Sequence, residues 1–158
     1  MSLLEWVLLV TAVLCGMAGG VFFAFSTYVM PALDRVAPAQ AVAAMQAINV
    51  AAVAPFTTVQ GAPAVLSMAL IVDALLDWLG TASALIVAAG VVYLGGLIAL
   101  TSAYHVPLNK GLDHVDPSGP EAAAAWRRYA GPWTRGNHVR ALAGVLAAGL
   151  FIAALRLV

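Results

Sequence analysis

The side chain in this sequence best suited to proton transfer is His138, which lies between Asn137 and Arg140 at the start of the last apolar segment. An imidazole takes up and releases a proton near neutral pH, so it can act as a general base. We therefore predict a catalytic role for His138. The alternative is structural: a residue at the start of a helix, hydrogen-bonded to the first connection.

Other polar side chains map near the same boundary of the apolar segments, and two interpretations of them remain open. In the first, they satisfy backbone carbonyls freed at prolines and bind lipid headgroups. In the second, they form the polar ring of a small-molecule pocket with an aromatic floor. The polar set is Ser26, Tyr28, Asp34, Gln46, Asn49, His105, Asn109, Asn137, His138 and Arg140, and the aromatic set is Phe22, Phe23, Phe25 and Trp133.

His105 is a second candidate for chemistry, and it shares a helix face with Asn109 only if Pro107 leaves the helix intact. Two histidines on different helices could also hold a transition metal or haem. No His-x-x-x-His, Glu-x-x-His or cysteine cluster supports such a centre, since Cys15 is the only cysteine. We predict no metal ligands, and a metal- or haem-dependent redox protein stays as an alternative.

The composition is typical of a membrane protein. Of 158 residues, 63% are hydrophobic and 9% are charged, and the mean hydropathy of +0.98 lies far from that of a soluble domain. Seven basic and seven acidic residues cancel, and a nucleic-acid partner would need a basic surface, so we exclude that class. We expect membrane lipids and a lipophilic small molecule as partners, and the oligomeric state is open, a homo-oligomer included.

Long apolar runs predict an all-α, integral membrane four-helix bundle that forms one domain, residues 1–158. Two short accessory helices are expected on the cytoplasmic side. One runs from Pro38 to about Val53 and is ended by Pro55; the other starts at a capping box of Ser118 and Glu121 and stops before Gly131. The predicted spans are residues 3–25, 57–78, 82–102 and 139–158, each bound being approximate.

Small residues recur four positions apart in the first and last spans. Gly16 and Gly20 form one such pair, with Gly19 beside them, and Gly144 and Ala148 form another. Because small side chains let helix backbones approach closely, these pairs predict tight helix contacts.

The basic residues predict the orientation, since Lys and Arg near span ends are retained in the cytoplasm. Arg35 lies in the first connection, whereas the opposite side holds only Arg156 and the terminal amine. We therefore expect an integral protein of a bacterial-type cell membrane, with both termini outside and the two long connections cytoplasmic. The remaining basic residues lie in or beside the third connection: Lys110, Arg127, Arg128, Arg135 and Arg140.

Four blocks of the sequence together resemble the anthrone-oxygenase-like family of small four-span membrane proteins, long catalogued as a domain of unknown function. The resemblance covers nearly the whole chain, and the blocks come in the family's order. They are residues 20–33 (GVFFAFSTYVMPAL), 45–49 (MQAIN), 106–109 (VPLN) and 133–140 (WTRGNHVR).

The resemblance implies an oxygenase that converts an anthrone to an anthraquinone with molecular oxygen, without flavin, haem or added metal. In such a reaction His138 would take a proton from the methylene, and Arg140, Asn137 or Asn49 would stabilise the oxyanion. The other residues expected to bind the substrate are Phe22, Phe25, Ser26, Gln46, His105, Asn109 and Trp133.

The main prediction is therefore a cofactor-independent membrane oxygenase that acts on a lipophilic aromatic substrate. A non-enzymatic membrane protein that binds a lipophilic ligand or a partner protein through the same pocket is the first alternative.

Overall fold

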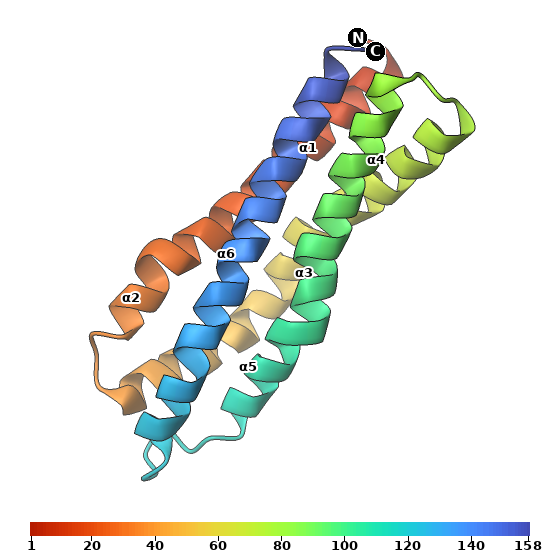
Figure 1. Cartoon of the computed structure of the whole chain (residues 1–158). Helices are drawn as coiled ribbons and strands as arrows, with labels where there is room; N and C mark the ends of the chain where they lie inside the picture. The colour runs from red at the N-terminus through yellow and green to blue at the C-terminus, as the bar shows by residue number, and fades with distance from the viewer.

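The computed structural model describes all 158 residues and consists of helices joined by short connections. Four continuous helical stretches are long and apolar enough to cross a membrane, which confirms the predicted all-α bundle. They run up and down, so that both termini lie at one end (Figure 1). The stretches are Leu3–Leu33, Pro38–Leu76, Thr81–Asp113 and Ala122–Leu155.

Two of these stretches contain short π-helical segments, in which the turn is widened. The first comprises α1 (Leu3–Ala24), η1 (Phe25–Val29) and α2 (Met30–Leu33). The third comprises α4 (Thr81–Tyr93), η2 (Leu94–Ala99), η3 (Thr101–His105) and α5 (Val106–Asp113). The second and fourth stretches are single helices, α3 (Pro38–Leu76) and α6 (Ala122–Leu155).

The widened turns η1 and η3 come just before Pro31 and Pro107. A proline ring inside a helix clashes with a carbonyl of the preceding turn, and a π-turn removes this clash without ending the helix. The chain therefore stays helical through Pro107. This meets the condition under which His105 and Asn109 share a helix face.

The accessory helices predicted as separate elements are not present. The segment after Pro38 is the first part of α3, which continues through Pro55 and Pro63, and the segment before Gly131 is the first part of α6. A membrane helix tolerates an internal proline because neighbouring groups satisfy the freed backbone.

The predicted capping box at the start of α6 does not form either. Ser118 bonds to the Asp116 carboxylate through both its backbone N–H and its hydroxyl. Glu121 occupies the N-cap position and makes no side-chain capping bond. The Asp116 carboxylate binds Ser118 in an Asx-type turn, so the serine hydroxyl does not cap the helix.

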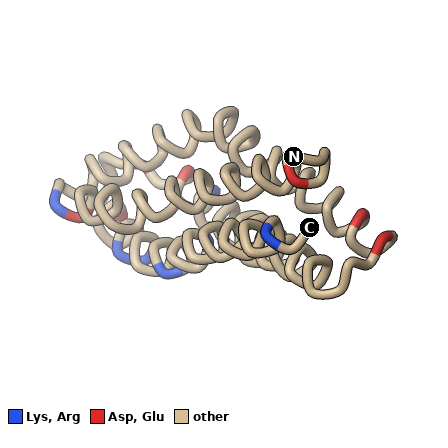
Figure 2. The backbone as a smooth tube through the Cα atoms, turned by 90° about the horizontal axis from the view of Figure 1, so that it is seen from above, with Lys and Arg blue, Asp and Glu red and all other residues tan.

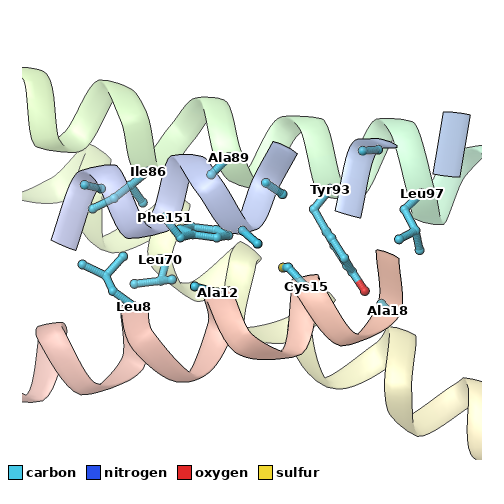
Figure 3. Packing of buried hydrophobic residues seen from close by; sticks show 14 of the residues in the cluster. Leu8, Ala12, Cys15, Ala18, Leu70, Ile86, Ala89, Tyr93, Leu97 and Phe151 are labelled. Atoms are coloured by element: carbon cyan, nitrogen blue, oxygen red, sulfur yellow. The ribbon is translucent and has the colours of Figure 1, made fainter. Parts of the chain in front are cut away.

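An apolar core fills the half of the bundle that holds the termini, where Leu8, Leu70, Ile86 and Phe151 pack against one another (Figure 3). Here α1 and α6 approach closely at Gly19 and Gly144. A Cβ on Gly144 would lie 2.7 Å from the Gly19 Cα, so neither position accepts a side chain without a shift.

The two predicted pairs of small residues have different outcomes. Gly16 faces Ala148, with 3.7 Å between an ideal Cβ on the glycine and the alanine Cβ, so the pair in α6 contacts α1 as expected. Gly20 faces open space, and Gly19 makes the close contact in its place.

A second apolar cluster lies at the end of the bundle that holds the long connections. It contains Met30, Met45, Trp126 and Trp133. Trp126 Nε1 donates to Asp34 Oδ1 at 2.7 Å, which joins α6 to the turn after α2. Most Lys and Arg residues lie toward this end, whereas acidic residues lie at both ends of the bundle (Figure 2).

Candidate functional site

A cavity of about 170 Å³ lies inside the bundle, on the side of the long connections. Helices α1, α3 and α6 and the η3–α5 segment all contribute to its wall. Seven of the predicted site residues line it: Phe22, Phe25, Asn49, His105, Asn109, Trp133 and Arg140. The remaining lining residues are Met45, Ile48, Ala52, Val53, Phe56, Gln60, Thr101 and Val106.

One wall of the cavity is aromatic. The ring of Phe56 packs against Phe22 and Phe25, with centroids 5.6 and 6.3 Å apart. Trp133 extends this surface at 6.0 Å from Phe25 and meets the edge of His105 at 5.5 Å. The sequence does not point to Phe56, because Pro55 predicts the end of a helix there, whereas α3 continues and turns Phe56 inward.

Arg140 is a buried cation without an acidic partner. Its side chain is 4% exposed, and the only ion pairs of the chain join the N-terminus to Glu5 and Arg128 to Glu121. The guanidinium lies over the Phe22 ring, 4.2 Å from its centroid. A buried unpaired charge is costly, so Arg140 at the cavity is a candidate functional residue.

Hydrogen bonds fix the orientation of this guanidinium. Arg140 Nη2 donates to Asn137 Oδ1 at 2.7 Å, and Nη1 lies 3.4 Å from Thr101 Oγ1. Asn137 in turn donates through Nδ2 to Phe22 O and Ser26 Oγ, at 2.6 and 2.7 Å. Asn137 and Ser26 are both buried but lie behind the cavity wall, where they position Arg140 against α1 and η1.

Two buried N–H donors at the cavity have no partner. They are Arg140 Nε and Asn49 Nδ2, and the third unsatisfied buried side-chain atom, Ser67 Oγ, does not line the cavity. Because buried donors are nearly always bonded, these two can donate to an acceptor inside the cavity, such as a water molecule or an oxygen atom of a ligand.

His105 is 1% exposed and is the only histidine that lines the cavity. Its Nε2 lies 3.2 Å from Trp133 O and its Nδ1 lies 3.4 Å from Leu100 O. A neutral imidazole carries one N–H, which we assign to Nε2 on the shorter distance, so that Nδ1 is unprotonated and its lone pair faces the Leu100 carbonyl oxygen. His105 can then accept a proton through Nδ1.

Asn109 stands beside His105, one turn later on the same helix, and its oxygen is held by two donors. Tyr129 donates its hydroxyl to Asn109 Oδ1 at 2.9 Å, and Trp133 donates Nε1 to the same oxygen at 3.0 Å. The amide therefore locks the indole of the aromatic wall in place.

His138 does not line the cavity, and the placement expected for it is wrong. The side chain is exposed, together with Val139, whereas Trp133, Asn137 and Arg140 are buried. Residues on one helix face recur every three or four positions, so a buried Asn137 turns its neighbour about 100° away.

Gln46 and Phe23 also lie away from the cavity. The Gln46 amide donates to Leu112 O and Val115 O, both at 2.9 Å, and so ties α3 to the end of α5. Phe23 is 60% exposed on the outer face of α1. Gln46 therefore satisfies carbonyls at a helix end, as the first interpretation of the polar residues predicts. Most of the other polar residues line the cavity or support its wall, as the second predicts.

No group of three or more His, Cys, Asp and Glu side chains is placed to hold a metal ion. A larger, more open cavity of about 440 Å³ lies at the end with the long connections, between α5 and the first part of α6. None of the predicted site residues lines it, and it contains no unsatisfied buried donor.

Comparison with known protein families identifies the family of the chain. A sequence model of the anthrone oxygenase family matches residues 54–150, a range that includes His105, Trp133 and Arg140. No curated protein and no solved structure matches the chain. The family model covers more than half of the 158 residues, and this membrane-type helical bundle belongs to the anthrone oxygenase family.

Proposed function

We propose that the chain is a membrane oxygenase that oxidises the activated methylene of a lipophilic aromatic ketone, such as an anthrone, with molecular oxygen. The observation that carries this proposal is Arg140, a buried guanidinium without an acidic partner, set over an aromatic wall beside an unsatisfied donor of Asn49. This arrangement suits a flat aromatic molecule that becomes an oxyanion during the reaction.

The first step is loss of a proton from the methylene. His105 is the lining side chain able to accept it, at Nδ1. The negative charge moves through the ring system to the carbonyl oxygen, where Arg140 Nε and Asn49 Nδ2 supply the two free donors. Both donors are held in place before the substrate arrives, so little reorganisation accompanies the charge.

The electron-rich carbanion then reacts with oxygen. A carbon–oxygen bond forms at the former methylene, and the proton held by His105 converts the peroxide anion to a hydroperoxide. Loss of water, which carries the second methylene hydrogen, leaves a carbonyl, so one oxygen atom enters the quinone and the other leaves as water. The aromatic wall of Phe22, Phe56 and Trp133 keeps bulk water from the anion.

The volume of the cavity favours a compact planar substrate. At about 170 Å³ it is smaller than the range of roughly 300–1,000 Å³ typical of pockets for drug-sized ligands. We therefore propose that the reacting ring and its carbonyl are enclosed, while substituents at the far edge extend beyond the cavity.

We retain the proposed orientation, with both termini outside. The basic residues gather at the end with the long connections, which is the cytoplasmic end under the positive-inside rule. The cavity then lies near the cytoplasmic face of the membrane.

The decisive assay is the conversion of anthrone to anthraquinone by the purified chain in detergent, under air and under nitrogen, followed by absorbance. We expect oxygen-dependent quinone formation above the protein-free rate. His105→Gln should lower the rate at least about 100-fold, as loss of a general base does, whereas the matched variant His138→Gln should leave it unchanged. Circular dichroism and gel filtration check that both variants fold.

A parent rate equal to background would contradict the oxygenase proposal. If anthraquinone still quenched the tryptophan fluorescence under those conditions, a ligand-binding protein would be the better description, because the two unpaired donors suit any ligand with an acceptor oxygen. Equal losses in the two histidine variants would remove His105 from the mechanism.

A further inference from the structure

Two residues in the wall of the smaller cavity are clearly exposed at the protein surface. Among its fifteen lining residues, Val53 is 66% exposed and Val106 is 39% exposed, and all others are buried or half-buried. Val53 lies on α3 and Val106 is the first residue of α5. We place the mouth of the cavity at these two most exposed lining residues, on the side of the bundle between α3 and α5.

The packing of α3 leaves room for an opening there. Helix α3 packs along α4 and η2 and touches α5, but it makes few contacts with η3, the segment between them. The two valines are therefore not sealed over by a neighbouring helix.

On the α3 side, the surface around this mouth is uncharged. Val50, one turn before Val53, is 76% exposed, and α3 carries no charged residue between its start and Asp73. The distance along the helix from Val53 to Asp73 is about 30 Å at 1.5 Å per residue, which is the thickness of the hydrocarbon layer. With Asp73 at one surface of the membrane, the mouth opens to lipid near the other.

We infer that the substrate enters this cavity sideways from the bilayer, through a portal framed by Val53 and Val106, and that the portal selects neutral, lipid-dissolved aromatic ketones over charged, water-dissolved ones. The inference rests on the proposed use of the cavity as the substrate site. A ligand that passes the two valines meets the donors of Arg140 and Asn49 only inside. The substrate therefore enters with its carbonyl group first, and its methylene loses a proton only after the substrate has left the lipid.

The competing route runs through the larger cavity at the end with the long connections. A hydrogen-bonded partition separates the two cavities: Tyr129 lines the larger one, Trp133 lines the smaller one, and both donate to Asn109. Passage from the end of the bundle would break these bonds, whereas the side portal requires no bond to break.

The test measures binding kinetics rather than turnover, so that it remains informative if the oxygenase assay fails. The full chain in lipid nanodiscs is mixed with anthraquinone, which lacks the reactive methylene, and quenching of tryptophan fluorescence is followed by stopped flow. Val53→Phe with Val106→Phe narrows the portal, and Val53→Ala with Val106→Ala widens it. Val50→Phe is the matched control, because Val50 is exposed on the same helix but does not line the cavity.

We expect the double phenylalanine variant to bind and release anthraquinone about tenfold more slowly, and the double alanine variant to do both faster. The Kd should change less than about twofold, because a constriction on the route affects both directions equally. Val50→Phe should behave as the parent.

Gly111→Phe tests the route from the end of the bundle, since Gly111 lines the larger cavity and has open space around it. Slower binding in this variant, with unchanged kinetics in the double phenylalanine variant, would overturn the portal. No quenching in the parent would overturn it too, because the cavity would then not take this class of ligand.

Discussion

The two ends of this bundle are built from the same four helices by different means. The half with the termini is joined by apolar packing, with α1 and α6 in backbone contact at Gly19 and Gly144. The half with the long connections contains prolines and the π-segments η1 and η3, and side-chain amides bridge its helices. One half has a filled core, and the other keeps a cavity with unpaired donors.

This difference separates stability from function within a single small chain. Close packing of small residues needs no polar group and leaves no space for a ligand. A cavity that holds a charged guanidinium costs stability, which the packed half offsets. Substitutions in the two halves should therefore affect different measured quantities.

The largest expected effect is that of Arg140→Met on activity. We expect quinone formation to fall at least about 100-fold, since a preorganised donor to the oxyanion is removed. The free energy of unfolding should change by less than about 1 kcal/mol, because loss of the Asn137 hydrogen bond is offset by removal of a buried unpaired cation. Unfolding in mixed micelles with increasing dodecyl sulfate measures this quantity. A collapse of stability with full activity per folded molecule would assign Arg140 to the scaffold.

Gly144→Ala should produce the opposite pattern in the packed half. The new Cβ would lie 2.7 Å from Gly19 Cα, so α1 and α6 must separate, at a cost of about 1–3 kcal/mol in the free energy of unfolding. Activity per folded molecule should stay near that of the parent. Gly149→Ala is the matched control, since an added Cβ there meets nothing within 4 Å. Equal stability of the two variants would show that the helix contact is looser than described.

Asn49 and Gln46 offer a sharper comparison, because they lie one turn apart on α3 and only Asn49 lines the cavity. Asn49→Leu should slow quinone formation about tenfold with little change in stability, since its Nδ2 has no partner in the protein. Gln46→Met should lower the free energy of unfolding by about 1–2 kcal/mol, because two carbonyls lose their donor. If Gln46→Met slowed quinone formation and Asn49→Leu lowered only the stability, the substrate site would lie outside this cavity.

The smallest effect on activity should come from Gly136→Ala, which displaces the side chain of His105, the proposed base. A Cβ at Gly136 would lie 2.8 Å from His105 Cε1 and 2.7 Å from Tyr104 Cε1, so the imidazole must move. We expect a decrease of about three- to tenfold in kcat with little change in KM. Gly131→Ala, whose Cβ would meet only Arg135 Nη1 at 3.8 Å, is the control. An unchanged kcat for Gly136→Ala would mean that the position of His105 is not critical.

Much of the architecture could be predicted from local features of the sequence. Hydropathy over windows of about 20 residues predicts helices that cross a membrane without any knowledge of their neighbours. The four blocks of residues pointed to the anthrone oxygenase family. The match over residues 54–150 confirms the family and contains the last two blocks. The concentration of polar residues at one end was visible too, because it depends only on where each residue lies along its helix.

The continuity of the helices through their prolines could not be predicted from local features of the sequence. Pro55 and Pro132 predict breaks when each proline is considered alone, yet α3 and α6 pass through both. Neighbouring helices and the apolar surroundings decide that outcome, since an interrupted helix inside a membrane would leave backbone groups without partners.

The rotation of each helix about its axis was decided by tertiary structure alone. Asn137 and His138 are adjacent in sequence and equally polar, yet Asn137 is buried against Phe22 while His138 faces outward. A turn of about 100° per residue separates them, and the contact of Gly144 with Gly19 in the packed half sets which of the two points inward. The sequence therefore determined the four membrane-type helices, the family and the polar end, whereas packing between helices decided that Arg140, Asn49 and His105 share one cavity.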